Sequence, residues 1–122
     1  MRIFVFGSNL AGRHGKGAAL YALKHHGAIY GQGWGRQGNS YGIPTKDRYL
    51  RTRHLDEIET DIYNFLFYAE EHPELEFDLT PIGCGLAGYK QEEIKPFFSK
   101  KPSNVHFTKE WKQDYNEVET FK

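Results

Sequence analysis

The sequence predicts an α/β fold built on a largely parallel sheet, and two observations support that prediction. Short apolar runs alternate with segments of helical periodicity along the 122 residues, as is typical of strand-helix-strand units. The 13 glycines fall into two clusters, one from Gly7 to Gly42 and one from Gly83 to Gly88, and each begins where an apolar run ends. Ligands of parallel sheets bind beyond the carboxyl ends of the strands, so both clusters are expected along that edge.

The first third of the chain predicts a strand, a loop and a helix. Residues 2–6 form a short β-branched and aromatic run, which indicates a buried strand. Residues 7–17 form the first glycine loop, and residues 18–26 are expected to be helical, with Gly27 ending the helix. Residues 28–40 are again rich in glycine, but their aromatic residues argue against a bare linker.

The middle of the chain contains the clearest helix. Residues 41–45 are expected to form a short strand that Pro44 confines to an edge of the sheet, and residues 46–54 a basic loop. Residues 55–71 carry apolar side chains at helical spacing, with acidic residues in the first turn, where the helix dipole favours negative charge.

The last third repeats the order of strand, glycine loop and helix. Residues 75–82 are expected to form a strand, residues 83–88 the second glycine loop, residues 91–99 a short helix and residues 104–108 a last strand. The tail, 109–122, is ambiguous, and a single domain is expected over 1–122.

Composition narrows the class of protein. Lys and Arg number 16, as do Asp and Glu, so the chain is formally neutral and lacks the basic surplus of most nucleic-acid-binding proteins. One cysteine excludes an intrachain disulfide and fits a reducing compartment. No apolar stretch could span a bilayer and the first residues lack the form of a signal peptide, so we expect a cytoplasmic protein without a membrane partner.

Two nucleotide-binding motifs match only in part. Residues 83–88 spell G-x-G-x-x-G, but too late in the chain to leave room for a dinucleotide-binding domain. Residues 7–12 spell the G-x-x-x-x-G part of a P-loop, but Arg13 and His14 stand where it needs Lys and Ser or Thr. Both interpretations are therefore set aside.

Several side chains have both a functional and a structural interpretation. Asn9 could bind a sugar hydroxyl pair or close an Asx turn, and Cys84 could be activated at a helix start or could simply fit a tight loop. His14 and Lys16 could bind phosphate, carry a proton or lie at the solvated surface. Trp34, with Tyr30 and Tyr41, could stack on a ligand or pack in the core.

Two further groups of residues were considered for binding. The basic run Arg48, Arg51, Arg53 and His54 fits a solvated loop or a phosphate or RNA contact. His25 and His26 lack partners for a metal site, so no metal is expected.

Three segments together resemble the macrodomain family of ADP-ribose-binding modules. Asn9-Leu10 followed by Gly12, Gly15, Lys16, Gly17 and Ala18 is similar to that family's asparagine and glycine run at the start of a helix. Residues 31–35 leading to Tyr41-Gly42-Ile43-Pro44-Thr45 are similar to its glycine segment before a tyrosine-x-leucine-proline strand. The most specific segment, residues 81–89, resembles the second phosphate loop in the branch that carries G-C-G-L-x-G.

The resemblance implies a macrodomain-like three-layer α/β/α sandwich with a diphosphate held between two loops. Asn9 would lie near the distal ribose, and Trp34 or Tyr89 against one end of the ligand. The implied binding residues are Gly7, Ser8, Asn9, Gly15, Gly17, Trp34, Gly83, Cys84, Gly85, Leu86, Ala87, Gly88 and Tyr89.

One departure from the family concerns the chemistry. Many hydrolytic members carry an aspartate after the first glycine run, whereas Ala18 and Ala19 stand there in this chain, and no acidic residue lies between Gly7 and Gly42. Lys16, His14 or Asp47 would then have to supply a catalytic group, unless a water polarised by the diphosphate does so.

Two functions follow as expectations. The first is binding of ADP-ribose or a related nucleotide sugar, with removal of ADP-ribosyl groups or processing of ADP-ribose derivatives. The second is a non-enzymatic module that sequesters or senses a signalling nucleotide. The expected partners are the small nucleotide and an ADP-ribosylated macromolecule, with no cofactor, and the neutral charge disfavours nucleic acid.

Overall fold

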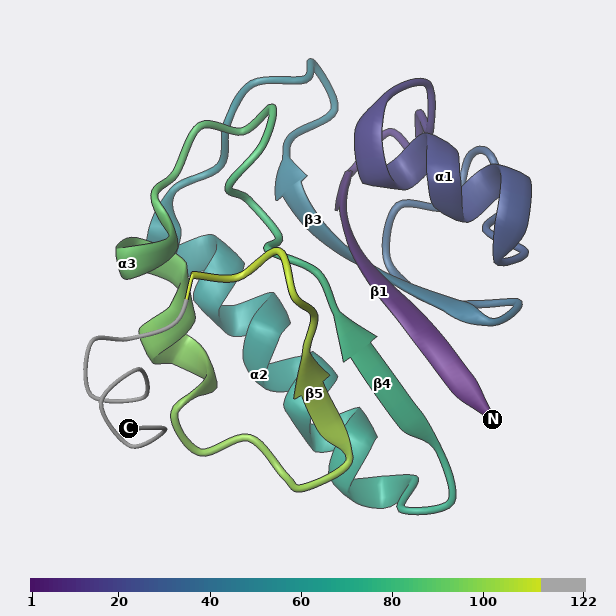
Figure 1. Ribbon diagram of the computed structural model, residues 1–122. Helices are drawn as coiled ribbons and strands as arrows, with labels where there is room; N and C mark the ends of the chain where they lie inside the picture. Colours follow the sequence, from purple (N-terminus) through teal and green to yellow (C-terminus); the bar gives the residue numbers. More distant parts are fainter. Residues whose placement is uncertain (113–122) are drawn as a thin grey trace.

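A mixed five-stranded sheet forms the centre of the molecule (Figure 1). The computed structural model describes residues 1–112. The strands are β1 (Arg2–Asn9), β2 (Gly35–Gln37), β3 (Ser40–Lys46), β4 (Glu76–Leu79) and β5 (Val105–Phe107). They lie in the order β2-β3-β1-β4-β5. All run parallel except β2, which pairs antiparallel with β3. The segment that follows the central strand β1 therefore lies at the middle of the sheet edge.

Helices cover both faces of this sheet (Figure 1). α1 (Gly17–His25) packs on one face, and α2 (Leu55–Glu71), α3 (Gln91–Ile94) and the 3-10 helix η1 (Lys95–Phe98) lie on the other. Strand β1 supplies both cores, because its side chains alternate: Ile3 and Val5 face the α2 side, and Phe4 and Phe6 face the α1 side. The α/β class predicted from the sequence is confirmed.

The core on the α2 side is the larger one and is rich in aromatic rings. Phe65 of α2 is fully buried, with its ring centroid 5.0 Å from that of Tyr41 and 5.3 Å from that of Phe77. Full burial of such a side chain contributes roughly 1.5–3 kcal/mol to folding. On the α1 side, Ala19 and Ala22 meet Phe6, and their small size lets the helix lie close to β1. None of the helices in the described part of the chain has the length and apolar character needed to cross a membrane.

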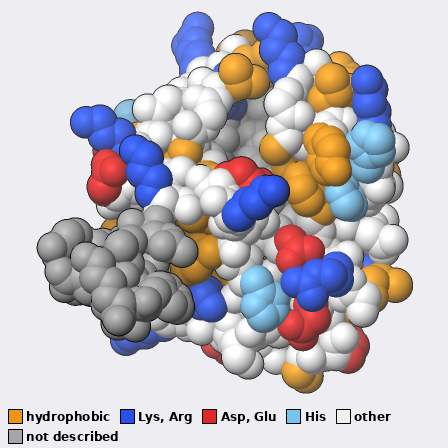
Figure 2. Space-filling view, viewed as in Figure 1, with side chains coloured by type: hydrophobic (Ala, Val, Ile, Leu, Met, Phe, Trp, Pro, Cys, Tyr) orange, Lys and Arg blue, Asp and Glu red, His pale blue; other side chains and the backbone are white. Residues whose placement is uncertain are grey.

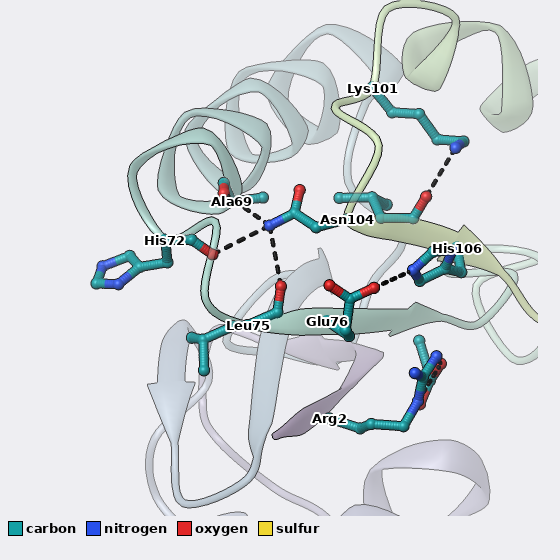
Figure 3. Close-up of polar contacts among 10 residues, drawn as sticks. Arg2, Ala69, His72, Leu75, Glu76, Lys101, Asn104 and His106 are labelled. Atoms are coloured by element: carbon teal, nitrogen blue, oxygen red, sulfur yellow. Dashed lines mark hydrogen bonds and ion pairs between the residues drawn. The ribbon is translucent and has the colours of Figure 1, made fainter.

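Asn104 ties the end of α2 to the strands beside it (Figure 3). Its Nδ2 amide donates to the carbonyl oxygens of Ala69, His72 and Leu75 at 3.0, 3.0 and 3.1 Å. The carbonyls of Ala69 and His72 also accept the N–H groups of His72 and Leu75, so the amide adds a second bond to each of them at the end of the helix. The amide thereby fixes where α2 ends and where β4 begins.

Polar cross-strand pairs cover the neighbouring strands (Figure 3). Arg2 Nη2 lies 2.6 Å from Asp78 Oδ1 across β1 and β4, and His106 Nε2 lies 2.6 Å from Glu76 Oε1 across β4 and β5. Both pairs lie on the same face as α1, because Phe77 and Val105 of the same strands point into the other core.

The element bounds correct the predictions in several places. β1 continues to Asn9 instead of ending at Phe6, because Gly7 and Ser8 still pair with Ile43 and Pro44 of β3. β4 ends at Leu79 rather than Ile82, since Thr80 turns its hydroxyl to the carbonyl oxygen of Val5 at 2.6 Å. α2 has the predicted bounds, and the helix predicted over 91–99 is divided into α3 and η1, where Pro96 lies in the first turn of η1.

The glycine-rich stretch before β3 contains a strand that the sequence did not reveal. β2 pairs Gly35, Arg36 and Gln37 with Gly42, Tyr41 and Ser40. The prediction that β3 is an edge strand was therefore wrong. Pro44 is tolerated because it lies beyond the three residues of β3 that pair with β2. In the tail, Trp111 is buried and donates from Nε1 to the carbonyl oxygen of Leu79 at 2.7 Å. The rest of the ambiguous tail, 113–122, lies outside the described residues.

Candidate functional site

A cavity of about 1090 Å³ opens beyond the carboxyl ends of the parallel strands. Its walls come from three stretches: residues 7–9 at the end of β1, residues 15–19 at the start of α1, and residues 80–87 after β4. The end of β3 contributes Lys46, and the loop after it contributes Leu50. Figure 2 shows this face hollowed toward the top of the view. Pockets for small ligands are commonly about 300–1,000 Å³, so the space suits a ligand of nucleotide size.

Part of each glycine cluster lies in the wall of this cavity: Gly7, Gly15 and Gly17 from the first, and Gly83 and Gly85 from the second. A Cβ added at Gly7 would lie 3.3 Å from the backbone nitrogen of Gly83, so the strand and the second loop are in direct backbone contact. Gly83 itself has a φ of +77°, which side chains rarely tolerate. Gly15 and Gly85 differ from both, because an added Cβ at either position would meet no atom of residues 1–112 within 4 Å. The space beside those two glycines belongs to the cavity.

Backbone N–H groups line two walls of the cavity. In the second loop, the N–H groups of Cys84 and Gly88 are used within the loop, bonded to Pro81 and Gly85. Those of residues 85–87 have no protein acceptor among residues 1–112. The first N–H groups of α1 have no partner within the helix, and Lys16 provides no side-chain cap. Unpaired backbone N–H groups of this kind can bind the anionic groups of a ligand, such as phosphate.

Cations outnumber acids around the cavity. Arg13, Lys16 and Lys46 line it, and none of the three forms an ion pair within residues 1–112. Glu110 is the one carboxylate among the described residues of the lining. The local field is therefore positive although the whole chain is neutral.

Cys84 lies in the cavity wall as a protonated thiol. Burial, followed by the negative charges of Glu93 and Glu92, raises the pKa of Cys84 to about 11. Its Sγ lies 3.4 Å from the carbonyl oxygen of Ile82, to which the thiol donates. Activation at a helix start would lower the thiol pKa, whereas here the pKa is raised, so the surroundings favour the structural interpretation of Cys84.

Asn9 lines the cavity but its amide already has backbone partners. Nδ2 donates to the carbonyl oxygen of Arg13 at 2.8 Å, and Oδ1 accepts from the N–H of Arg13 at 2.9 Å. This pair of bonds shapes the loop that leads to α1. The neighbouring Ser8 donates its hydroxyl to the carbonyl oxygen of Gly33. One N–H and one lone pair of the Asn9 amide remain for a ligand.

His14 is fully buried and does not line the cavity. Its ring packs edge-on against Phe6, with centroids 5.3 Å apart. Its Nε2 lies 2.9 Å from the carbonyl oxygen of Gln32 and 3.1 Å from Oε1 of Gln37. Both neighbours are acceptors, so Nε2 carries the proton. These contacts hold the glycine-rich segment before β3 against the first loop, which favours a structural role rather than the catalytic one expected.

Four more of the expected site residues do not line the cavity: Asp47, Trp34, Gly88 and Tyr89. Oδ1 of Asp47 accepts from the N–H groups of Tyr49 and Arg51 at 2.8 and 2.9 Å, so this carboxylate orders its own loop. Trp34 is 54% exposed on the surface. Tyr89 donates its hydroxyl to the carbonyl oxygen of Arg53 at 2.5 Å and thereby fixes the second loop to the loop before α2. Lys16 is the one of the three candidate catalytic residues that lines the cavity.

Three aromatic residues line the cavity, of which the sequence had indicated only Tyr30 as a ligand contact. Phe4, Tyr21 and Tyr30 contribute to its walls, with Tyr21 and Tyr30 more than half exposed. Of the three aromatic residues considered for stacking, Tyr30 lines the cavity, Trp34 does not, and Tyr41 is buried in the larger core. Alternation along β1 could have placed Phe4 on the α1 face, and Tyr21 lies on α1, but the place of Tyr30 depends on the path of an irregular segment. Within residues 1–112, no group of three His, Cys, Asp or Glu side chains could hold a metal ion.

Comparison with known proteins adds a fold relative. No family model matches the chain, and neither does any curated protein. A solved structure of a protein of unknown function from Bacteroides thetaiotaomicron is similar, with a TM-score of 0.63 and 16% sequence identity. The match covers 88% of this chain and 87% of that one. At this identity the likeness shows a shared fold and says nothing of the ligand.

Proposed function

We propose that this protein binds ADP-ribose or a related nucleoside diphosphate sugar. The observation that carries the proposal is the cavity itself. Two glycine-containing segments, residues 15–19 and 80–87, face it beyond the ends of parallel strands, with N–H groups that lack acceptors among residues 1–112. A diphosphate suits this space because it offers several acceptor oxygens and two negative charges to groups spread over two walls.

The charges and aromatic rings support the same ligand class. Arg13 and Lys16 lie beside the helix N-terminus and would add charge-assisted bonds to phosphate oxygens. Phe4, Tyr21 and Tyr30 offer ring surface for a base or a ribose. Asn9 would give its remaining N–H and lone pair to ribose hydroxyls. The resemblance of the three sequence segments to macrodomains points to the same ligand, and a macrodomain-like sandwich is part of this proposal.

The cavity lining favours binding over hydrolysis. Its titratable groups in the described residues are cations, tyrosines, the protonated Cys84 and the single carboxylate Glu110. A general base needs a group that accepts a proton near neutral pH within reach of the attacking water. We therefore rank a module that sequesters or senses the nucleotide before an ADP-ribosyl hydrolase. In the hydrolase alternative, Lys16 is the candidate residue that would contact the ligand.

Isothermal titration calorimetry with ADP-ribose tests the proposal. We expect saturable heat with one site, weaker heat with ADP, and none with ribose 5-phosphate, which lacks the diphosphate. If none of the three ligands gives binding heat while circular dichroism shows that the protein is folded, the proposal is wrong. Single-turnover assays on ADP-ribosylated protein and on ADP-ribose 1″-phosphate then separate the alternatives. Unchanged substrate despite binding supports the module, and turnover supports the hydrolase.

A further inference from the structure

A short ordered loop stands at the mouth of the cavity, and we name residues 47–51 the rim loop. The N–H of Asp47 donates to the carbonyl oxygen of Arg51 at 2.8 Å, and the N–H of Leu50 donates to the carbonyl oxygen of Asp47 at 3.1 Å. The Asp47 carboxylate accepts two more N–H groups from within the loop. A bridge between Lys46 and Thr52 closes its base. The loop is therefore held in one conformation by its own bonds.

Leu50 adopts a backbone conformation that leucine avoids. Its φ is +64°, and it is the one non-glycine residue with a positive φ within residues 1–112. Such a conformation costs a leucine roughly 1–2 kcal/mol, whereas glycine or asparagine adopts it readily. The side chain lines the cavity and remains 40% exposed, so its burial offsets this cost only in part. Strained backbone positions cluster at functional sites.

The surroundings of Leu50 have the composition of a protein-binding surface. Tyr49 is 78% exposed, with the Arg51 guanidinium 5.5 Å from its ring centroid, and Leu86 of the second loop is 66% exposed. Thr52 fastens the two loops together, since its hydroxyl donates to the carbonyl oxygen of Ala87 at 2.8 Å. Tyrosine and arginine are the residues most enriched at the energetic centres of interfaces. We name the rim loop together with Leu86 the rim surface.

The charge of the rim surface selects an acidic partner. Arg48 and Arg51 are exposed and adjoin Lys46, and the single carboxylate of the loop, Asp47, is already bonded to two N–H groups. Figure 2 shows Lys and Arg side chains around the hollow at the top of the view. Two exposed leucines suit apolar side chains of a polypeptide better than nucleobases, which bind by stacking on aromatic rings. The chain also lacks the net positive charge typical of nucleic-acid binding.

We propose that the rim surface docks an acidic polypeptide segment beside the cavity. This inference rests on the proposed function, in that the segment would carry the ADP-ribosyl group held inside. Arg48 and Arg51 pair with its carboxylates, while Leu50 and Leu86 contact its apolar side chains. The strained leucine is then explained, because glycine or asparagine at position 50 would relax the backbone but remove the contact.

The test measures peptide and nucleotide binding separately. Fluorescence anisotropy follows a labelled peptide rich in Glu and Leu, and calorimetry follows free ADP-ribose. Reversing both charges in the Arg48→Glu/Arg51→Glu variant should weaken peptide binding at least about tenfold and leave free ADP-ribose binding unchanged, since neither side chain lines the cavity. Leu50→Gly should weaken peptide binding while raising the melting temperature. Phe67→Ser, at an exposed position on α2, is the matched control and should leave peptide binding unchanged.

Each outcome bears on one proposal or the other. Peptide binding that survives the double charge reversal overturns the rim proposal even if ADP-ribose binds. Peptide binding lost in the double variant, together with no heat from ADP-ribose, keeps the docking surface and rejects the proposed ligand. Tighter binding of a single-stranded DNA of equal charge, lost in the same variant, overturns the polypeptide in favour of nucleic acid. A Leu50→Gly variant that binds peptide like the wild type overturns the role of the strained leucine.

Discussion

Replacing Gly85 with glutamate should abolish most ligand binding without harming the fold. An added Cβ at Gly85 meets no atom of the described part of the chain within 4 Å, and the backbone there is outside the region reserved for glycine. The free energy of unfolding should therefore change by less than about 0.5 kcal/mol, as at other open surface positions. The new carboxylate would instead enter the cavity wall, beside the N–H groups that we assign to the diphosphate.

The loss of affinity can be worked from Coulomb's law. A carboxylate about 5 Å from one phosphate charge, at an effective dielectric constant between about 20 and 80, costs about 1–3 kcal/mol. That cost lowers the affinity for ADP-ribose about 5- to 150-fold. The variant Gly85→Gln is the matched control, because it has nearly the same size and no charge. The difference between the two variants isolates the electrostatic part.

Calorimetry at about 50 mM and about 500 mM NaCl provides the assay, and thermal unfolding checks the fold. The gap in affinity between the Glu and Gln variants should shrink at the higher salt concentration. Equal affinities for the two variants at low salt would refute the assignment of phosphate to this wall. A melting temperature well below that of the wild type would refute the structural premise that the space beside Gly85 is open.

Three further predictions concern the walls and the core. Gly33→Ala should lower the free energy of unfolding by about 2 kcal/mol or more, because its Cβ would lie 2.0 Å from the carbonyl oxygen of Asn9. Chemical denaturation measures this loss. An unchanged denaturation midpoint would contradict the close packing of Gly33 against the end of β1. Cys84 should react with iodoacetamide at pH 8 about 100-fold more slowly than a free thiol, because its raised pKa, about 11 against 9.0, lowers the thiolate fraction. The reaction rate should rise as the pH approaches 11. Rapid labelling at neutral pH would argue against a buried thiol. Phe65→Ala should lower the free energy of unfolding by about 3–5 kcal/mol, because it leaves a cavity between Tyr41 and Phe77. Phe67→Ala, on the exposed side of α2, should lower it much less. Similar losses for both variants in chemical denaturation would contradict the orientation of the helix.

Elements with regular periodicity could be predicted from the sequence. α2 has the predicted bounds because its apolar residues, such as Ile58, Ile62 and Phe65, recur at helical spacing and face one core. Four of the five strands were also predicted, although β1 is longer and β4 shorter than expected, because pairing with neighbours decides where a strand ends. Periodicity in one segment carries no information about its neighbours in the sheet.

The glycine-rich segment before β3 could not be predicted, since contacts distant in sequence fix it. The Gln37 amide accepts from the N–H of Ile29 at 2.8 Å and donates to the carbonyl oxygen of Gln32 at 3.1 Å. An added Cβ at Gly12 would lie 2.2 Å from the carbonyl carbon of Gly31, so two loops touch backbone to backbone. These contacts form β2 and bury His14, and nothing local in the sequence encodes them.

Some features of the candidate site could be predicted from the sequence, and others could not. That both glycine clusters would lie along one sheet edge followed from the order of the elements, and Gly7 and Gly83 do lie in one cavity wall. Side chains on irregular segments did not follow: Tyr30 lines the cavity, whereas Trp34, also considered as a ligand contact, does not. Whether a loop side chain turns inward depends on backbone angles such as the φ of Leu50, and residue type alone does not reveal these.

A nuclear magnetic resonance titration of the backbone amides with ADP-ribose tests the central claim most directly. If the two glycine loops hold the diphosphate, the largest shift changes will fall on the N–H groups of residues 15–18 and 83–87, and amides of α2 will stay in place. Saturation should follow a single binding curve for both loops. Shift changes confined to one loop, or centred on α2, would contradict the account of one shared site.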